Sequence, residues 1–163
     1  MKKIVIMLFA IVSFSCSNAQ KTEFSKIALD ETLLTTFGKQ ISFKKILEQY
    51  KGKTVLIEVW ASWCGDCIKN MPKLKELQAN NPNVVYLFLS ADKTADKWKE
   101  GIEKHELKGD HFMMNDLMKG KFGTAIDLDW IPRYIILDKT GKIVVYRAIE
   151  TDFDKVNQTL KSI

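Results

Sequence analysis

Two cysteines three positions apart, Cys64 and Cys67, constrain this chain more than any other feature. They follow an apolar run over residues 54–60 that predicts a strand buried on both faces, and a helix is predicted over residues 65–80. The N-terminus of a helix offers free N–H groups and the positive end of the helix dipole, which stabilise a thiolate. Such a thiolate attacks disulfides, and a second thiol nearby resolves the mixed disulfide. The spacing therefore predicts a redox-active pair.

The number of cysteines supports a chemical role for this pair. The chain has three cysteines in 163 residues, too few for a disulfide scaffold. The alternative is half of a zinc site, because two cysteines at this spacing are common zinc ligands. Zinc takes four ligands, however, and the sequence has neither a second such pair nor an HxxxH motif. We therefore predict redox chemistry without a metal, and without a cofactor because the disulfide itself carries two electrons.

The N-terminal segment predicts export from the cytoplasm. A short basic start precedes an apolar run over residues 4–14 and a small-x-small site that ends at Ala19. The run is too short to span a membrane, which takes roughly 20 apolar residues. We interpret residues 1–19 as a signal peptide and residues 20–163 as a single domain. The competing interpretation is a lipoprotein signal that ends before Cys16, which would then carry a lipid anchor.

Charge gives little evidence for a nucleic-acid partner. The formal net charge is +5 at pH 7, and removal of residues 1–19 leaves 23 basic and 20 acidic residues, a net charge of +3. No cluster of Lys or Arg alternates with aromatic residues. We therefore predict no nucleic-acid binding and expect the lysines to cover solvated helix faces.

The remaining pattern predicts an α/β fold with a central mixed β-sheet flanked by helices. Before the cysteines, we predict a hairpin (24–30 and 32–37) and a short helix (43–50) capped by Ser42. After the cysteine helix, we predict a strand (84–90), a helix (94–105) and a helical patch (115–122). The chain is then expected to form a second hairpin (133–137 and 142–148) and a closing helix to about residue 161, capped by Thr151 or Asp152.

Four features at consistent offsets resemble the thioredoxin family. The pentapeptide Trp63-Cys64-Gly65-Asp66-Cys67 matches its W-C-x-x-C signature, and Pro72 lies where thioredoxins kink the active-site helix. Ile131-Pro132 is similar to the cis-proline loop, and Glu58 occupies the place of the buried acid. The leading hairpin, the export signal and the long stretch over residues 106–130 make the chain most similar to the exported TlpA/ResA-type branch.

This resemblance covers roughly residues 24–163 and implies a thioredoxin fold with an N-terminal hairpin and a helical insertion before the cis-proline loop. It implies that Cys64 is the exposed attacking thiol and Cys67 the buried resolving thiol. Glu58 would be a buried acid that moves a proton to or from Cys67. The alternative for Glu58 is a strand residue that points to solvent.

The resemblance also implies which residues contact a bound partner. They are Trp63, Gly65, Asp66, Ile131, Pro132 and Arg133. A cis bond before Pro132 would leave a backbone edge beside the cysteines free to pair with an extended substrate segment. Asp66 replaces the proline that is commoner in thioredoxins, and Arg133 stands where Thr is frequent. Substrate choice and redox potential therefore do not carry over from the family.

The charges beside the cysteines predict a reductant. Asp66 places a carboxylate within a turn of Cys64, and Glu58 adds a second acid. Both disfavour the Cys64 thiolate and oppose the helix dipole. Attacking cysteines have pKa values from about 3.5 in strong oxidants to about 7 in reductants, and we expect the upper end here. The expected partners are exported proteins with disulfides and a membrane-bound electron donor.

A copper-binding chaperone is the alternative function. His111 lies close in sequence to Met113, Met114 and Met118. Imidazole, thioether and thiolate ligands suit copper, so these residues could act with the cysteine pair. Methionines near helical spacing are more often core residues, and we therefore favour the oxidoreductase.

Overall fold

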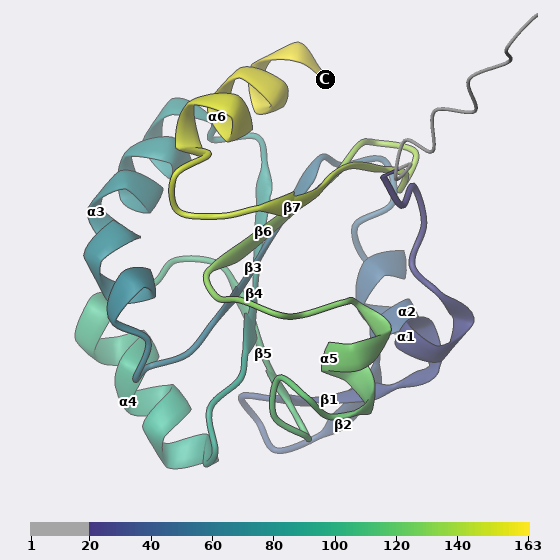
Figure 1. Cartoon of the computed structure of the whole chain (residues 1–163), viewed down its shortest axis with the longest axis vertical. Helices are drawn as coiled ribbons and strands as arrows, with labels where there is room; N and C mark the ends of the chain where they lie inside the picture. The colour runs from purple at the N-terminus through teal and green to yellow at the C-terminus, as the bar shows by residue number, and fades with distance from the viewer. Residues whose placement is uncertain (1–19) are drawn as a thin grey trace, which may run out of the picture.

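A seven-stranded mixed sheet runs through the protein, and helices cover both of its faces (Figure 1). The computed structural model describes residues 20–163, so the predicted signal peptide and Cys16 lie outside the described residues. Within the described part of the chain, no helix is both long and apolar enough to cross a membrane.

The strand order in the sheet is β2-β1-β5-β4-β3-β6-β7. The strands are β1 (Thr32–Thr35), β2 (Gln40–Ser42), β3 (Val55–Trp60), β4 (Val85–Ser90), β5 (Asp110–Met114), β6 (Arg133–Leu137) and β7 (Ile143–Ala148). The helices are α1 (Lys26–Asp30), α2 (Phe43–Glu48), α3 (Gly65–Asn80), α4 (Ala95–His105), α5 (Lys121–Ala125) and α6 (Phe153–Ser162).

The central strand is β3, and all six of its residues are buried, as its apolar run predicted. It pairs in parallel with β4 and antiparallel with β6. β4 pairs in parallel with β5, whereas β1, β2 and β7 run antiparallel to their neighbours. The carboxyl ends of β3, β4 and β5 therefore lie at the same end of the sheet, where the chain leaves β3 and enters the cysteine loop.

Helices α3, α4 and α6 lie on one face of the sheet, and α1, α2 and α5 lie on the other (Figure 1). On the first face, Phe153 of α6 packs against Tyr134 of β6, with ring centroids 5.2 Å apart. On the second face, Phe43 of α2 packs edge-on against Phe122 of α5 at 5.1 Å. These aromatic contacts join the two helix layers to the hydrophobic core of the sheet.

The local predictions around β3 are confirmed. Ser42 caps α2, because its hydroxyl accepts a hydrogen bond from the backbone N–H of Lys45 at 3.3 Å. Helix α3 has the predicted bounds and contains Pro72. The central mixed sheet flanked by helices is also confirmed, and the chain has an N-terminal hairpin, although other residues than the predicted ones form it.

Two predictions outside this region are wrong. Residues 24–30, expected as a strand, contain the short helix α1, because Ser25 caps it and accepts from the N–H of Ala28 at 3.2 Å. β1 and β2 form the hairpin instead. The helical patch expected over residues 115–122 is shifted to the five-residue helix α5, and the unpredicted strand β5 precedes it. β5 forms between β4 and β1, which are distant in sequence, so local patterning did not indicate it.

Candidate active site

The loop between β3 and α3 holds the two cysteines as a disulfide. The sulfur atoms are bonded at 2.11 Å, and the Cα atoms lie 5.3 Å apart. Cys64 is the N-cap of α3, and its sulfur accepts a hydrogen bond from the backbone N–H of Cys67 at 3.1 Å. Cys64 is 6% exposed and Cys67 is 0% exposed. The sulfur of Cys64 is therefore the one nearer to solvent and to the helix N-terminus, which is the place of an attacking thiol.

The loop that leads into β6 lies against this disulfide. The peptide bond between Ile131 and Pro132 is cis, as predicted. The Cys64 sulfur lies 3.7 Å from the carbonyl oxygen of Ile131. Pro132 is buried, and β6 begins at the next residue. The backbone of residue 131 therefore borders the sulfur that would attack a partner.

Two exposed indole rings flank the contact between Cys64 and Ile131. Trp63 precedes Cys64 and is 57% exposed, and Trp130 precedes Ile131 and is 51% exposed. The two residues between the cysteines are also exposed. Exposed aromatic side chains around a polar or reactive group are typical of protein contact surfaces. Sequence reasoning missed Trp130, although its place directly before the Ile-Pro pair was an available signal.

Glu58 of β3 is a buried carboxylic acid, 2% exposed. Its Oε1 accepts a hydrogen bond from the Tyr134 hydroxyl at 3.4 Å, and its Oε2 has no hydrogen-bond partner among the described residues. Burial raises the pKa of Glu58 to about 8, although the hydrogen bond from Tyr134 lowers it in part. A carboxyl group with this pKa can exchange a proton with a thiol near neutral pH.

The strand register explains where Glu58 points. Glu58 lies opposite Tyr134 across the β3–β6 pair, and Tyr134 packs against Phe153 of α6. Directly opposed residues point to the same face of a sheet. Glu58 therefore points into the layer that holds α3, in which Cys67 is buried, and not to solvent. Sequence offered no signal for Tyr134, because only the register brings it to Glu58.

The structure contradicts the predicted partner contact of the Arg133 side chain. Arg133 is 1% exposed and lies opposite Val59, the residue after Glu58, so it points to the other face of the sheet. Its guanidinium forms an ion pair with Asp129 and donates a hydrogen bond to the carbonyl oxygen of Asp127 at 3.4 Å. Arg133 thus holds the loop before the cis-proline in place, because strand alternation turns its side chain inward.

The residues considered as copper ligands are packing residues in and around β5. Met113 and Met114 are buried in the core. The His111 ring stacks on Phe88 with centroids 4.9 Å apart, and its Nε2 lies 3.1 Å from the carbonyl oxygen of Leu107. β4 lies between β5 and β3, so the structure does not assemble this group with the cysteine pair. In the described part of the chain, no cluster of three or more His, Cys, Asp or Glu side chains is arranged to hold a metal ion.

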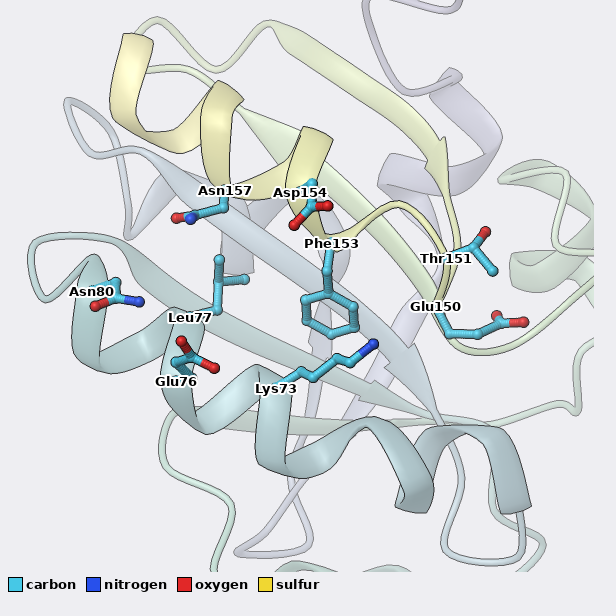
Figure 2. Close-up of a pocket in the computed structure, with 9 residues that line it drawn as sticks. All are labelled: Lys73, Glu76, Leu77, Asn80, Glu150, Thr151, Phe153, Asp154 and Asn157. Carbon is cyan, nitrogen blue, oxygen red and sulfur yellow. The ribbon is translucent and has the colours of Figure 1, made fainter.

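A groove between α3 and α6 is separate from the cysteine site (Figure 2). It has a volume of about 230 Å³ and is lined by side chains from both helices and from the turn after β7. Lys73 of α3 lies beneath the ring of Phe153, with its Nζ 5.9 Å from the ring centroid. Its lining contains neither cysteine and no residue of the cis-proline loop. The groove therefore marks the packing of α6 on α3 and not the redox surface.

Several known proteins are similar to this chain in sequence and in fold. The Redoxin family model matches residues 21–161. The thiol-disulfide oxidoreductase ResA of Bacillus cereus is 27% identical over 167 residues, which cover 98% of this chain and 92% of ResA. The thiol:disulfide interchange protein DsbE of Haemophilus influenzae is 26% identical over 99% of this chain and 94% of its own length. A Bacteroides vulgatus protein assigned to the thiol-disulfide oxidoreductases, known from its solution structure, is 30% identical, with a TM-score of 0.67 over 92% of this chain and 91% of that protein.

These similarities extend over nearly the whole described chain and include the strand, loop and helix that hold the cysteines. With the mixed sheet and the cis-proline loop, they confirm the thioredoxin fold and the resemblance found in the sequence. The chain belongs to the Redoxin family, as a thioredoxin-like thiol–disulfide oxidoreductase of the TlpA/ResA type.

Proposed function

We propose that this protein is exported and reduces disulfide bonds in cell-envelope proteins by cycling Cys64 and Cys67 between dithiol and disulfide. The observation that carries the proposal is the disulfide at the N-terminus of α3, with the attacking sulfur beside the cis-proline loop. The disulfide itself carries the two electrons, so the reaction requires no cofactor. Residues 20–163 form the single domain that performs it.

The reaction begins with the reduced dithiol. The Cys64 thiolate attacks one sulfur of the partner's disulfide, and the other partner sulfur leaves as a thiolate. Glu58 then takes the proton of Cys67, and the Cys67 thiolate attacks the Cys64 sulfur of the mixed disulfide. The bond between Cys64 and the partner breaks, and the partner sulfur leaves as a thiolate. The products are the Cys64–Cys67 disulfide and a partner with two free sulfurs, which take up one proton from Glu58 and one from solvent, the latter replacing the proton that Cys64 released when it ionised. The pKa of Glu58, about 8, lies near the ordinary thiol value of about 8.5, so the proton passes at little cost.

Charge near the attacking sulfur supports the reducing direction. Asp66 is an exposed carboxylate in the first turn of α3. Its charge opposes the stabilisation that the helix N-terminus gives to the Cys64 thiolate. A less stable thiolate makes the reduced protein a better electron donor than a strong oxidant of the same fold. A membrane-bound donor would return the electrons after each cycle.

Clients are expected to bind as extended segments across the disulfide. The indoles beside Cys64 provide apolar contact area, and the backbone of the cis-proline loop provides hydrogen-bonding groups. The residues that we assign to client contact are Trp63, Gly65, Asp66, Trp130, Ile131 and Pro132.

Export rests on the N-terminal sequence. Residues 1–19 have the basic, apolar and small-residue regions of a signal peptide. The alternative, lipidation at Cys16, would place the same domain at a membrane surface. Mass spectrometry of the mature N-terminus distinguishes the two, since a free N-terminus at Gln20 indicates cleavage and a lipidated Cys16 indicates an anchor.

Trapping with Cys67→Ser tests the function. Cys64 then attacks partner disulfides but cannot be released, so mixed disulfides accumulate and mass spectrometry of envelope extracts identifies the clients. The matched control is Cys64→Ser, which keeps the buried thiol and is expected to trap almost nothing. The purified wild-type protein is expected to accelerate the reduction of insulin by dithiothreitol. A protein that neither traps a client nor accelerates this reaction would contradict the proposal.

A further inference from the structure

Asp92 is a buried carboxylate that the proposed reaction does not use. It lies two residues beyond β4 and is 2% exposed. Its two oxygens accept hydrogen bonds from the backbone N–H of Ser62 at 3.0 and 3.2 Å, from the Ser62 hydroxyl at 2.7 Å and from the Ser90 hydroxyl at 2.8 Å. The carboxylate of Asp92 therefore joins the end of β4 to the loop that carries the cysteines.

Within residues 20–163, no basic side chain forms an ion pair with this buried carboxylate. All of the hydrogen-bond donors to Asp92 are uncharged. Burial of a carboxylate without a cationic partner is costly, and a neutral amide in the same place would avoid this cost. Packing by itself therefore does not explain why a charged side chain occupies this position.

Asp92 is bonded to the loop that carries Cys64, so its charge lies close to the attacking thiol. Ser62 is two residues before Cys64, so their Cα atoms lie no more than about 7.6 Å apart. The backbone N–H of Cys64 closes the loop with a hydrogen bond to the carbonyl oxygen of Ala61 at 3.0 Å. Helix α4 also packs against this loop, since a Cβ atom on Gly101 would meet the Ser62 Cβ at 2.7 Å. The loop is thus held rigidly between β4 and α4.

We propose that Asp92 is a positioning residue of the dithiol site, which holds the Ser62–Cys64 turn in place and disfavours the Cys64 thiolate through its negative charge. This inference deepens the proposed function and rests on it for the reducing direction. The other titratable groups on the segments that meet at the turn are Asp66 in the first turn of α3, Glu58 on β3, and the exposed residues Lys69 of α3 and Lys93 beside Asp92. Buried charge is screened less by salt than exposed charge, so Asp92 acts on Cys64 more strongly than its exposed neighbours at equal distance.

Asp92→Asn removes the charge and leaves residue 92 hydrogen-bonded to both Ser62 and Ser90, although the second contact of the Ser62 N–H is lost and the bond with the Ser62 hydroxyl reverses its direction. The amide oxygen accepts from the Ser62 N–H and the Ser90 hydroxyl, and the amide nitrogen donates to the Ser62 hydroxyl. We expect the pKa of Cys64, followed by the ultraviolet absorbance of its thiolate, to fall by about one unit. At a pH above this pKa, the equilibrium constant for reduction by glutathione is expected to rise about tenfold.

Ser90→Ala is the matched control, because it removes one donor to Asp92 and keeps the charge. It is expected to lower the thermal stability slightly and to leave the pKa of Cys64 close to the wild-type value. If Asp92→Asn also left the pKa and the glutathione equilibrium unchanged, Asp92 would have only a structural role and the inference would be wrong. Both readouts use the isolated protein, so they are independent of whether it reduces insulin or traps a client.

The wild-type protein provides a second test if Asp92→Asn does not fold. The charge on an ionised Cys64 also acts on the Asp92 carboxylate through its electric field. In the reduced protein, the ¹³C resonance of the Asp92 carboxyl carbon is expected to shift with the titration of Cys64. Cys64→Ser is expected to abolish this shift. A wild-type resonance that does not change through the Cys64 titration would overturn the inference.

Discussion

The hydroxyl group of Tyr134 donates the one hydrogen bond that the Glu58 carboxyl group receives among the described residues, across the β3–β6 pair at 3.4 Å. The second carboxyl oxygen of Glu58 is buried without a partner. Burial therefore dominates, and the pKa of Glu58 is raised to about 8. Glu58 is therefore a proton acceptor with a pKa close to that of a thiol, in the helix layer where Cys67 is buried. Substitution of Glu58 or of Tyr134 tests this site.

Glu58→Gln removes the proton acceptor for Cys67 and keeps the size of the side chain. We expect the resolution of mixed disulfides to slow about a hundredfold, a typical loss for a general base. Rapid-quench measurement of the release of a reduced peptide checks this. Glu76→Gln, on the exposed side of α3, is the control and is expected to resolve at the wild-type rate. Equal rates in the two variants would exclude Glu58 as the base.

Glu58 also makes the stability of the folded protein depend on pH. Its pKa rises from 4.5 in an ordinary environment to about 8 on folding, so the folded protein holds the proton more tightly than the unfolded chain. This contribution, up to about 5 kcal/mol, is fully present below the unfolded pKa and is lost as the pH rises through the folded pKa. Urea denaturation of the oxidised protein over this pH range measures it. Glu58→Gln is expected to lack this decline, and parallel curves for the two proteins would contradict the raised pKa.

Tyr134→Phe removes the hydroxyl group and keeps the ring that packs on Phe153. The hydrogen bond from Tyr134 lowers the pKa of Glu58, so its loss is expected to raise that pKa above about 8. The ¹³C resonance of the Glu58 carboxyl carbon reports this shift directly. Tyr86→Phe is the control, since the Tyr86 hydroxyl donates to the carbonyl oxygens of Leu77 and Asn81 and not to Glu58. The same titration in both variants would mean that the contact with Tyr134 does not tune the acid.

Trp130→Ala tests the client surface. Removing an exposed indole beside the cis-proline loop is expected to raise KM for a disulfide-containing protein about tenfold, as for a contact residue at an interface. The pKa of Cys64 and kcat are expected to stay close to wild type, because Trp130 is uncharged and the hydrogen bonds of the cysteines among the described residues do not involve it. Steady-state kinetics with insulin measures the split between KM and kcat.

Phe37→Ala is the matched control for this prediction. Phe37 is 90% exposed in the turn between β1 and β2, at the end of the sheet opposite to the cysteine loop. Its substitution is expected to leave KM unchanged. If Trp130→Ala behaved like Phe37→Ala, the client surface would not include the loop before the cis-proline.

Local patterns in the sequence predicted the part of the molecule that carries the chemistry. The continuous apolar run predicted β3, and the cap at Ser42 predicted α2, since both signals depend on residues close together in the chain. The spacing of Cys64 and Cys67 at a strand-to-helix junction was enough to predict a disulfide-forming pair, because the geometry of one helical turn brings the two sulfurs together. The family resemblance added the cis bond at Pro132.

The sequence by itself therefore determined that this protein has a dithiol at the mouth of a helix on an α/β sheet. Only the tertiary structure decided that β5 joins the sheet, that Glu58 is buried against Tyr134, and that Arg133 turns inward while Trp130 stays exposed. The physical reason is that periodicity and capping act between near neighbours, whereas the register of distant strands determines which face each side chain occupies. A shift of one residue in the register of β6 would move Arg133 and Tyr134 to the opposite faces of the sheet.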